Sequence, residues 1–551
     1  MRGSHSGPAH SATGPPAAEP SSVTESDDPI LRGPGSHAGP GVPGGPFEPR
    51  RPSKPGGHSE PGAGPAAAAV CPESEDGAEP LTEPDAEAQV HGICFKTGPP
   101  GRLGVELEWL VCDGRDPALP VDQRRAATAV ARLGAGGPLP GRGVLTTEPG
   151  GQVEISSAPA AGLGHCIAVT SLDLAALRQA IQQAGLCLNG QGLDPLRPPR
   201  RVLELPRYAA MEKFFDRAGP WGRLMMCSTA SVQVCVDAGG EGPGWSGFRW
   251  RWHLLHAIGP VLVAAFANSP LRGGRPTGWK STRQAIWARL DPTRTRPPAH
   301  AEPVPGRRPG RAWPPATDPR SAWVDYALAA EVMCVRRPGA HDWSAPPGLT
   351  FRDWLRGAGE RPPTSSDLSY HLSTLFPPVR PRGHLEVRGI DAQPGDGWMV
   401  PLAVTAALLD DPLAAEQAMA AAEALWHRPT PGGPGGPGGP GAPGRPGTGA
   451  DPAGWHPASP WWLAARHGPA HPALAAASRR CFAAAEAALA RAGGPADVRQ
   501  AVTAFAERYV NRDRCPADDV LDQVRAGRGC SPPPGPAHTL VEDCNGQQAQ
   551  A

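Results

Sequence analysis

The chain has 551 residues, enough for one large folded domain together with unstructured segments. Lysine and arginine (53) balance aspartate and glutamate (53), so no net charge would draw the protein to nucleic acid or to an anionic membrane. Glycine (70) and proline (72) make up about a quarter of the chain, at the edge of low-complexity composition. Because these residues are unevenly distributed, they mark flexible segments around a folded core.

The cysteine pattern and the apolar runs exclude several classes of protein. The twelve cysteines are scattered without a C-x-x-C pair, which argues against a zinc knuckle, a thioredoxin-like site or a disulfide framework. The first thirty residues contain no apolar segment typical of a secretory signal. The longest apolar stretch, Leu254 to Ala267, contains His256 and Pro260 and is too short to span a bilayer. We therefore expect a cytoplasmic protein with reduced thiols and no membrane partner.

Four segments are expected to lie outside the compact fold. Residues 1–87 cannot bury enough apolar surface to offset chain entropy, so they are predicted to be a disordered extension. Residues 292–319, rich in Arg and Pro, are predicted to form a mobile loop, and residues 429–456, with Gly-Gly-Pro repeats, a spacer. Residues 528–551 are predicted to be a disordered tail. The remainder of residues 88–527 is expected to form one folded domain.

Within that domain, hydrophobic periodicity distinguishes strands from helices. Order is expected to begin near Val90. Alternating apolar and polar residues predict strands at 104–110, 152–156, 225–237 and 384–388. Apolar residues at helical spacing, or Ala-rich stretches, predict helices at 126–133, 167–184, 248–267, 401–427, 472–492 and 495–510.

The most informative stretch runs from Thr147 to Ser157. A Pro-Gly-Gly turn, preceded by Glu148, opens into a short strand. Because alternate side chains of a strand share a face, Gln152, Glu154 and Ser156 are expected to project together. Two carboxylates and an amide held by a stiff strand suit a hard cation, which prefers oxygen ligands.

The polar faces of the four predicted strands, placed side by side, carry acidic, amide and basic side chains. These are Glu106, Glu108, Glu148, Gln152, Glu154, Gln233, Asp237, His384, Glu386 and Arg388. Five glutamates on one sheet face would repel one another and would be desolvated at a cost. Divalent cations would resolve this conflict, and Mg²⁺ bound in this way usually also holds substrate phosphates. Arg388 beside Glu386 offers a fixed charge for a phosphate or a carboxylate, so the residues favour Mg²⁺-dependent phosphoryl chemistry with ATP.

Each motif also has a structural interpretation. A Glu-x-Glu pair is commonly the solvated face of an antiparallel sheet, a Glu-x-Arg pair a cross-strand ion pair, and Pro-Gly-Gly only a turn. Arg283 could cap a helix or pair with an acidic group, and Gln233 could be a sheet-face amide. The occurrence of four such strands in one chain favours the metal site.

Seven stretches of the chain form an ordered set of motifs. They are Gly104–Glu108, Glu148–Ser156, Met225–Val234, Phe266–Pro270, Ser281–Trp287, His371–Pro378 and Leu385–Arg388. In this order they resemble the glutamate–cysteine ligase family of plants and many bacteria. The resemblance extends from about Val90 to Val510 and is strongest to the actinobacterial branch, which makes γ-glutamylcysteine for ergothioneine biosynthesis.

The resemblance implies a fold and a reaction. The fold would be α+β and glutamine-synthetase-like: a curved antiparallel sheet with an acidic concave face, backed by helices, with residues 88–527 as the catalytic domain. ATP would phosphorylate the γ-carboxylate of L-glutamate, and the amine of L-cysteine would attack the γ-glutamyl phosphate, giving γ-glutamylcysteine, ADP and phosphate. The expected cofactors are ATP and Mg²⁺. The alternatives are a related carboxylate–amine ligase with another amine acceptor and a non-catalytic relative that binds nucleotide or glutamate.

The resemblance also implies roles for individual residues. The expected metal ligands are Glu106, Glu108, Glu148, Glu154, Gln233 and Glu386. The residues expected to bind the nucleotide and its phosphates are Glu148, Gln152, Gln233, Glu386 and Arg388. Glu154, Arg283 and Arg388 are expected to act in catalysis, the two arginines as phosphate or substrate-carboxylate contacts. Where the family commonly has Gln-Val-Asn, this chain has Gln233-Val234-Cys235, so a polar contact is expected to be lost.

Overall fold

The computed structural model describes residues 79–135, 137–298, 318–337, 339, 342–426 and 459–527. The predictions for residues 1–78, for 299–317 of the Arg/Pro loop, for the spacer and for the tail concern residues outside this description. The described part combines helices with an antiparallel sheet, so the predicted α+β class is confirmed.

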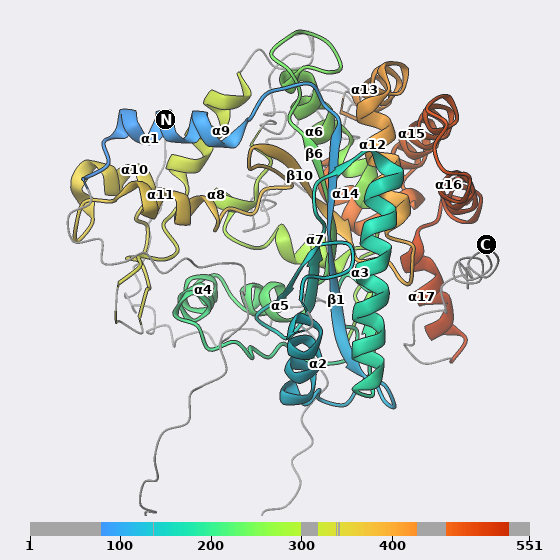
Figure 1. The fold of residues 1–551 in the computed structure, drawn as a ribbon, viewed down its shortest axis with the longest axis horizontal. Helices are drawn as coiled ribbons and strands as arrows, with labels where there is room; N and C mark the ends of the chain where they lie inside the picture. The colour runs from blue at the N-terminus through green and yellow to red at the C-terminus, as the bar shows by residue number, and fades with distance from the viewer. Residues whose placement is uncertain are drawn as a thin grey trace, which may run out of the picture.

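Within the described residues, an eight-stranded antiparallel sheet lies at the centre of the molecule (Figure 1). Its main path runs in the order β2 (Val144–Thr147), β3 (Val153–Ser156), β1 (Arg102–Asp113), β6 (Ser231–Asp237), β10 (His384–Asp391) and β9 (Val379–Pro381). Two short strands, β4 (Ala160–Ala161) and β5 (Leu186–Asn189), pair with opposite ends of β1. The strands β7 (Leu271–Arg272) and β8 (Arg275–Pro276) form a separate hairpin. Strands far apart in sequence are thus neighbours in the sheet.

Helices surround this sheet (Figure 1). They are α1 (Glu83–Cys94), α2 (Gln123–Ala135), α3 (Leu163–Gln183), α4 (Pro206–Asp216), α5 (Trp221–Ser228), α6 (Phe248–Ala265), α7 (Thr282–Trp287), α8 (Pro292–Thr295), α9 (Pro319–Ala329), α10 (Phe351–Asp353), α11 (Ser365–Leu372), α12 (Met399–Asp410), α13 (Pro412–Trp426), α14 (Pro460–His467), α15 (Pro472–Arg491), α16 (Ala496–Arg508) and α17 (Pro516–Arg525). Helices α3, α6 and α12 contact the sheet directly, and α13, α15 and α16 form a further layer outside them.

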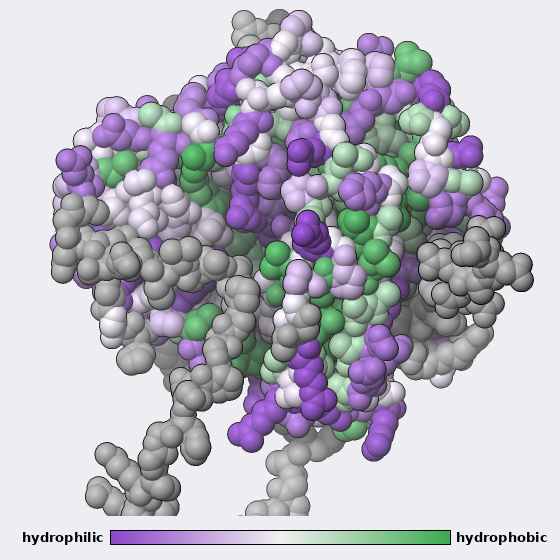
Figure 2. Space-filling view, viewed as in Figure 1, coloured by the Kyte–Doolittle hydropathy of each residue, from purple (hydrophilic) through white to green (hydrophobic). Residues whose placement is uncertain are grey.

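The core lies between the sheet and these helices. In β1, Leu103, Val105 and Leu107 alternate with polar residues and are buried against the helical layer, as the period of two requires. Helix α6 is apolar on nearly all sides and is almost completely buried, as expected of a helix enclosed by other elements. The outer surface differs, because Figure 2 shows hydrophilic groups spread over this side with apolar ones between them. Among the described helices, none is long and apolar enough to cross a membrane.

The first ordered helix begins earlier than predicted. Helix α1 starts at Glu83, inside the segment 1–87 that was expected to be disordered. The Thr82 hydroxyl caps it by accepting a hydrogen bond from the Asp85 amide (3.3 Å), and Pro84 occupies the first turn. Ala86 is buried in the core, so packing orders this short segment. Its polar composition does not predict that packing.

Three other boundaries differ from the sequence-based expectation. The segment predicted as one strand, 225–237, is helical up to Ser228 because a short apolar run is compatible with either structure. The predicted helix 401–427 is two helices that meet at Asp411, which caps α13 through a hydrogen bond from the Ala414 amide (2.8 Å). The predicted loop 292–319 begins with α8, where Arg294 is fully buried.

A buried histidine is expected to make stability pH-dependent. His371 is buried, and burial lowers its pKa to about 3, although its hydrogen bond with the Ala327 carbonyl (2.8 Å) acts in the opposite direction. As the pH falls, His371 is protonated in the unfolded chain before it is protonated in the folded protein. The free energy of unfolding is therefore expected to fall by about 2 kcal/mol between pH 6.5 and 5 because of this histidine. Urea unfolding of the protein and of His371→Gln at both pH values tests this, because the variant should show a smaller decrease. An equal decrease in both would contradict it.

Candidate active site

Cross-strand pairing brings the polar side chains of four strands onto one face. Glu108 of β1 lies directly opposite Glu154 of β3, and Glu106 lies opposite Gln233 of β6. Glu386 of β10 lies opposite Cys235 of β6, two residues along from Gln233. Directly opposed residues of an antiparallel pair project from the same face of the sheet. The structure therefore brings together side chains that the sequence places up to 280 residues apart (Glu106 and Glu386).

A buried ion-pair network surrounds Glu386, which is completely inaccessible to solvent. Arg380 of β9 donates from Nε to Oε2 (3.0 Å) and from Nη2 to Oε1 (2.9 Å). Arg388 donates from Nη1 to Glu386 and also to Oε1 of Gln233. Burial would raise the pKa of Glu386, but Arg380 and Arg388 outweigh it and lower the pKa to about 2. Glu386 is therefore an ionised carboxylate with a fixed orientation.

Sequence reasoning missed Arg380. It lies opposite Glu386 in the β9–β10 hairpin, and this register follows from the tight turn between the two strands. The signal that could have found it is an arginine six residues before a strand glutamate, with a glycine between them at Gly383, whose φ is +81°.

Gln233 links the basic and acidic parts of this face. Its Nε2 donates to Oε1 of Glu108 (2.9 Å), and its Oε1 accepts from Arg388. The amide is thus oriented by its partners rather than free to rotate. Burial raises the pKa of Glu108, while Arg283 and Arg388 oppose the increase.

The remaining glutamates carry more negative charge than the arginines compensate. Glu154 accepts hydrogen bonds from the hydroxyls of Thr146 and Ser156 (both 3.1 Å), yet burial and the charge of Glu108 raise its pKa to about 7. Burial, together with Glu386 and Glu154, raises the pKa of Glu106 to about 8. Burial and the neighbouring glutamates also raise the pKa of Glu148 well above its ordinary value. This face would therefore gain from an added cation.

The donor set fits Mg²⁺ shared with a phosphate. Within the part of the chain that the structure describes, no three His, Cys, Asp or Glu side chains converge into a metal-binding group. Mg²⁺ is typically held by one or two carboxylates together with water and substrate phosphates rather than by a complete protein cage. Pairs such as Glu108 and Glu154, directly opposite on neighbouring strands, suit that mode of binding.

The Pro-Gly-Gly turn positions Glu148 beside these strands. The Gly151 amide donates to the Glu148 carbonyl, and the Glu148 amide donates to the Gln152 carbonyl (both 2.8 Å). The Gln152 side chain accepts from the Gly150 amide (3.0 Å) and donates to the Thr229 carbonyl (3.0 Å). Its amide is therefore occupied in holding the turn against the end of α5. Both ends of the Gln152 side chain bind the backbone, which gives this residue a structural role in the turn, and its expected nucleotide contact stays a prediction.

A methyl group at Gly150 is expected to disrupt this turn. A Cβ there would lie 2.2 Å from the Cys227 carbonyl oxygen and 2.5 Å from the Cys227 Cα, so the turn would have to move. The Gly150→Ala variant is expected to lose about 3 kcal/mol of unfolding free energy, at the upper end of overpacking costs. Urea denaturation measures this. Gly92→Ala in α1 is the matched control, because its added Cβ meets nothing within 4 Å and should be neutral or stabilising.

Arg283 is buried beside the polar face, next to Glu108 and the backbone of β10. In α7 it is 1% exposed, and its Nη2 donates to the backbone carbonyl of Arg388 (3.0 Å). Its guanidinium lies 4.6 Å from the ring centroid of Trp287 and 3.9 Å from Asp391. Burial lowers the pKa of Arg283, and Asp391 and Glu108 oppose this. Its Nε and Nη1 lack hydrogen-bond partners among the described residues, so it retains donors for an anion.

Asp391 organises two of the motifs and was also missed. It is 1% exposed and accepts hydrogen bonds from the Asn268 amide (2.9 Å) and from the Ser269 and Ser281 hydroxyls (2.7 and 2.9 Å). The stretches Phe266–Pro270 and Ser281–Trp287 thus meet at the end of β10. No local spacing predicts this meeting, because the segments come from separate elements.

A fourth arginine, Arg207 of α4, approaches the site from the side of Glu148. Its Nη1 donates to the Ser373 hydroxyl (3.1 Å), and its guanidinium lies 5.2 Å from the ring centroid of Tyr370. Arg207 opposes the increase in the pKa of Glu148. Burial, with a smaller contribution from Glu148, raises the pKa of the adjacent Tyr208 to about 12. The acidic group therefore has a cation at each side, Arg388 and Arg207.

Comparisons with known proteins agree with these motifs. Residues 102–430 match the family described as Glutamate-cysteine ligase family 2. Glutamate–cysteine ligase EgtA of Mycobacterium tuberculosis is 37% identical over 465 residues, which cover 83% of this chain and 94% of that protein. The chloroplastic glutamate–cysteine ligase of Medicago truncatula is 32% identical over 264 residues, 46% of this chain and 48% of that protein. A crystal structure of glutamate–cysteine ligase from Francisella tularensis in complex with AMP covers 79% of this chain and 86% of that chain, at 12% identity and a TM-score of 0.40.

Proposed function

The chain belongs to the glutamate–cysteine ligase family 2, and from this premise we propose that it joins L-glutamate to L-cysteine with ATP. The product is γ-glutamylcysteine, released with ADP and phosphate. The observation that carries the proposal is family membership over most of the chain, together with a continuous polar face that contains every glutamate of the family motifs on β1, β3 and β10.

The reaction transfers a phosphoryl group between two anions. The γ-phosphoryl group of ATP moves to the γ-carboxylate of glutamate, and ADP leaves. The amine of cysteine then attacks the carbonyl carbon, the C–N bond forms as the nitrogen loses a proton, and phosphate departs with the former carboxylate oxygen. Such a reaction needs alignment and charge neutralisation more than a protein nucleophile.

The buried arginines supply fixed positive charge. Arg388 is held by Glu386 and Gln233, so its orientation is set before the substrate arrives. Its Nε and two nitrogens of Arg283 lack partners among the described residues, and a substrate carboxylate or phosphate would satisfy them. Arg388 and Arg283 are therefore the proposed anion contacts.

The glutamates Glu106, Glu108, Glu148 and Glu154 are the proposed metal ligands, with Glu386 and Gln233 completing the set. When bound, Mg²⁺ supplies charge neutralisation for the triphosphate. The raised pKa values of Glu106 and Glu154 support this assignment, since an added cation would favour their ionised forms. A glutamine-synthetase-like arrangement, with these groups on a concave sheet face backed by helices, is part of the same proposal.

We also propose a cytoplasmic location and a role in supplying γ-glutamylcysteine to ergothioneine biosynthesis. The likeness to the mycobacterial relative supports that role. The nine described cysteines are free thiols, the form in which cysteines persist in a reducing compartment.

The test is ADP release by the purified protein with Mg²⁺-ATP and L-glutamate, with and without L-cysteine, with the product identified by mass. Cysteine-dependent ADP release with equimolar γ-glutamylcysteine is expected. A response to another amine but not to cysteine would reassign the acceptor. Nucleotide binding without turnover would instead indicate a non-catalytic relative.

A further inference from the structure

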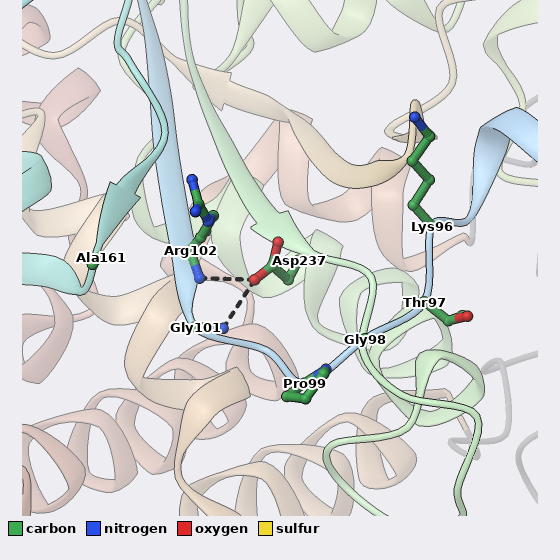
Figure 3. A pocket seen from close by; sticks show the side chains of 8 residues that line it. All are labelled: Lys96, Thr97, Gly98, Pro99, Gly101, Arg102, Ala161 and Asp237. Atoms are coloured by element: carbon green, nitrogen blue, oxygen red, sulfur yellow. Dashed lines mark hydrogen bonds between the residues drawn. The ribbon is translucent and has the colours of Figure 1, made fainter.

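A cavity of about 460 Å³ lies at the end of the sheet where β1 begins and β6 ends (Figure 3). The segment from Lys96 to Arg102 forms one wall, and Asp237, the last residue of β6, lies between its ends. In Figure 3 the side chains of Lys96 and Arg102 extend in the same direction from the two ends of this segment. None of the residues proposed above as metal ligands or anion contacts lines this cavity.

The wall is anchored by backbone hydrogen bonds. One carboxylate oxygen of Asp237 accepts from the Gly101 amide (2.9 Å) and from the Arg102 amide (2.8 Å). The Gly98 amide donates to the Gly239 carbonyl (3.0 Å), and the Lys96 amide donates to the Gly383 carbonyl (3.1 Å). The loop is thus tied to β6 and to the β9–β10 turn, so the cavity has a defined shape.

The cavity is positively charged. Lys96 and Arg102 line it, and among the described residues their side chains make no ion pair or hydrogen bond. Arg382 in the neighbouring β9–β10 turn adds positive charge nearby, which also acts on Glu386. The carboxylate of Asp237 already accepts two backbone hydrogen bonds. An anionic ligand would therefore find unpaired cations here.

The cavity continues the polar face that carries the glutamates. Arg102, Gly104 and Glu106 alternate along β1 and share one face, and Arg102 lies roughly 13 Å from Glu106 along the strand. The position between them is Gly104, which lies opposite Cys235 on β6. Because Gly104 and Cys235 are both small, neither places a long side chain between the cavity and the glutamates.

We propose that this cavity binds the nucleoside end of ATP, with Lys96 and Arg102 neutralising the phosphate nearest the ribose. The inference rests on the proposed function, which puts the terminal phosphates at the glutamates. The volume of the cavity suits a nucleoside, since ligand sites are typically about 300–1,000 Å³. The opposite side of the glutamate group, beside Arg207 and Tyr208, is left for the two amino acids.

The test uses three variants of the cavity: Lys96→Met, Arg102→Met and the double variant that combines them. The control is Arg124→Met, which removes an exposed arginine of α2. Isothermal titration with ADP and Mg²⁺ measures the nucleotide dissociation constant without turnover. Each single variant is expected to raise it about tenfold, as for loss of one charge-assisted hydrogen bond. The KM for ATP should rise in parallel, whereas the KM values for glutamate and cysteine should not change. Arg124→Met should match the parent.

Unchanged ADP affinity in the double variant would overturn the proposal, and so would a selective loss of glutamate affinity. A further measurement compares how inorganic phosphate and ADP protect Lys96 from acetylation. If phosphate protects it to the same extent as ADP at equal concentration, the site is a general anion site and the nucleoside assignment is overturned. Failure of the proposed function is distinguishable. In that case the parent binds ADP and the variants weaken it, but no γ-glutamylcysteine forms.

Discussion

Replacing Glu154 with glutamine is expected to reduce γ-glutamylcysteine formation about a thousandfold, the upper range for loss of one preorganised electrostatic group. The substitution keeps the shape of the side chain and an oxygen that can accept from Thr146 and Ser156. It removes the negative charge that faces Glu108 across the β1–β3 pair. Since the proposed Mg²⁺ site needs that charge, turnover should fall while the fold is preserved. Coupled measurement of ADP release and of the product by mass gives the rate.

The same variant has a second expected property, measurable without turnover. Burial raises the pKa of Glu154 to about 7, above its unfolded value, so holding it ionised costs stability as pH rises from 4.5 through 7. Metal-free Glu154→Gln should therefore unfold at the same or a higher temperature than the parent at pH 8. Glu416→Gln, an exposed position on α13, is the control and should change neither property. A fully active Glu154→Gln enzyme would contradict the assignment.

Removing the side chain of Arg388 is expected to destabilise the protein by about 3 kcal/mol, because breaking a buried ion pair leaves an uncompensated charge. Arg388→Ala takes away the donor to Glu386 and Gln233, so Glu386 keeps only Arg380. It also removes a cation that opposes the raised pKa values of Glu106 and Glu108. Urea unfolding measures the loss, and ligase activity should fall in the same variant.

Arg388→Lys separates charge from geometry. Lysine restores the positive charge but not the planar guanidinium, so stability should recover more than kcat does. Arg132→Ala, an exposed position on α2, controls for the loss of an arginine in general. If Arg388→Ala were as stable and as active as that control, the buried network would have no part in holding the site.

The local sequence pattern predicted the structure correctly where the alternation of a single strand was enough to identify it. The alternation at Gly104–Leu110 and at His384–Arg388 lies within β1 and β10, and the Pro-Gly-Gly turn connects β2 to β3. It failed where burial decides the structure. Met225 to Ser228 are helical because they belong to α5, which packs against α4 and α7, and periodicity over four residues cannot reveal this.

The sequence by itself determined which side chains share a strand face, because strand alternation is a local property of the backbone. It also determined family membership, through the order of its motifs. Only the tertiary structure decided which strands are neighbours, and hence that Arg380 pairs with Glu386 and that Gln233 joins Glu108 to Arg388. Only the fold showed that the Gln152 amide is occupied by the backbone of the turn and of α5. Register and burial arise from contacts between distant segments, and these contacts set the charge and orientation of each group in the site.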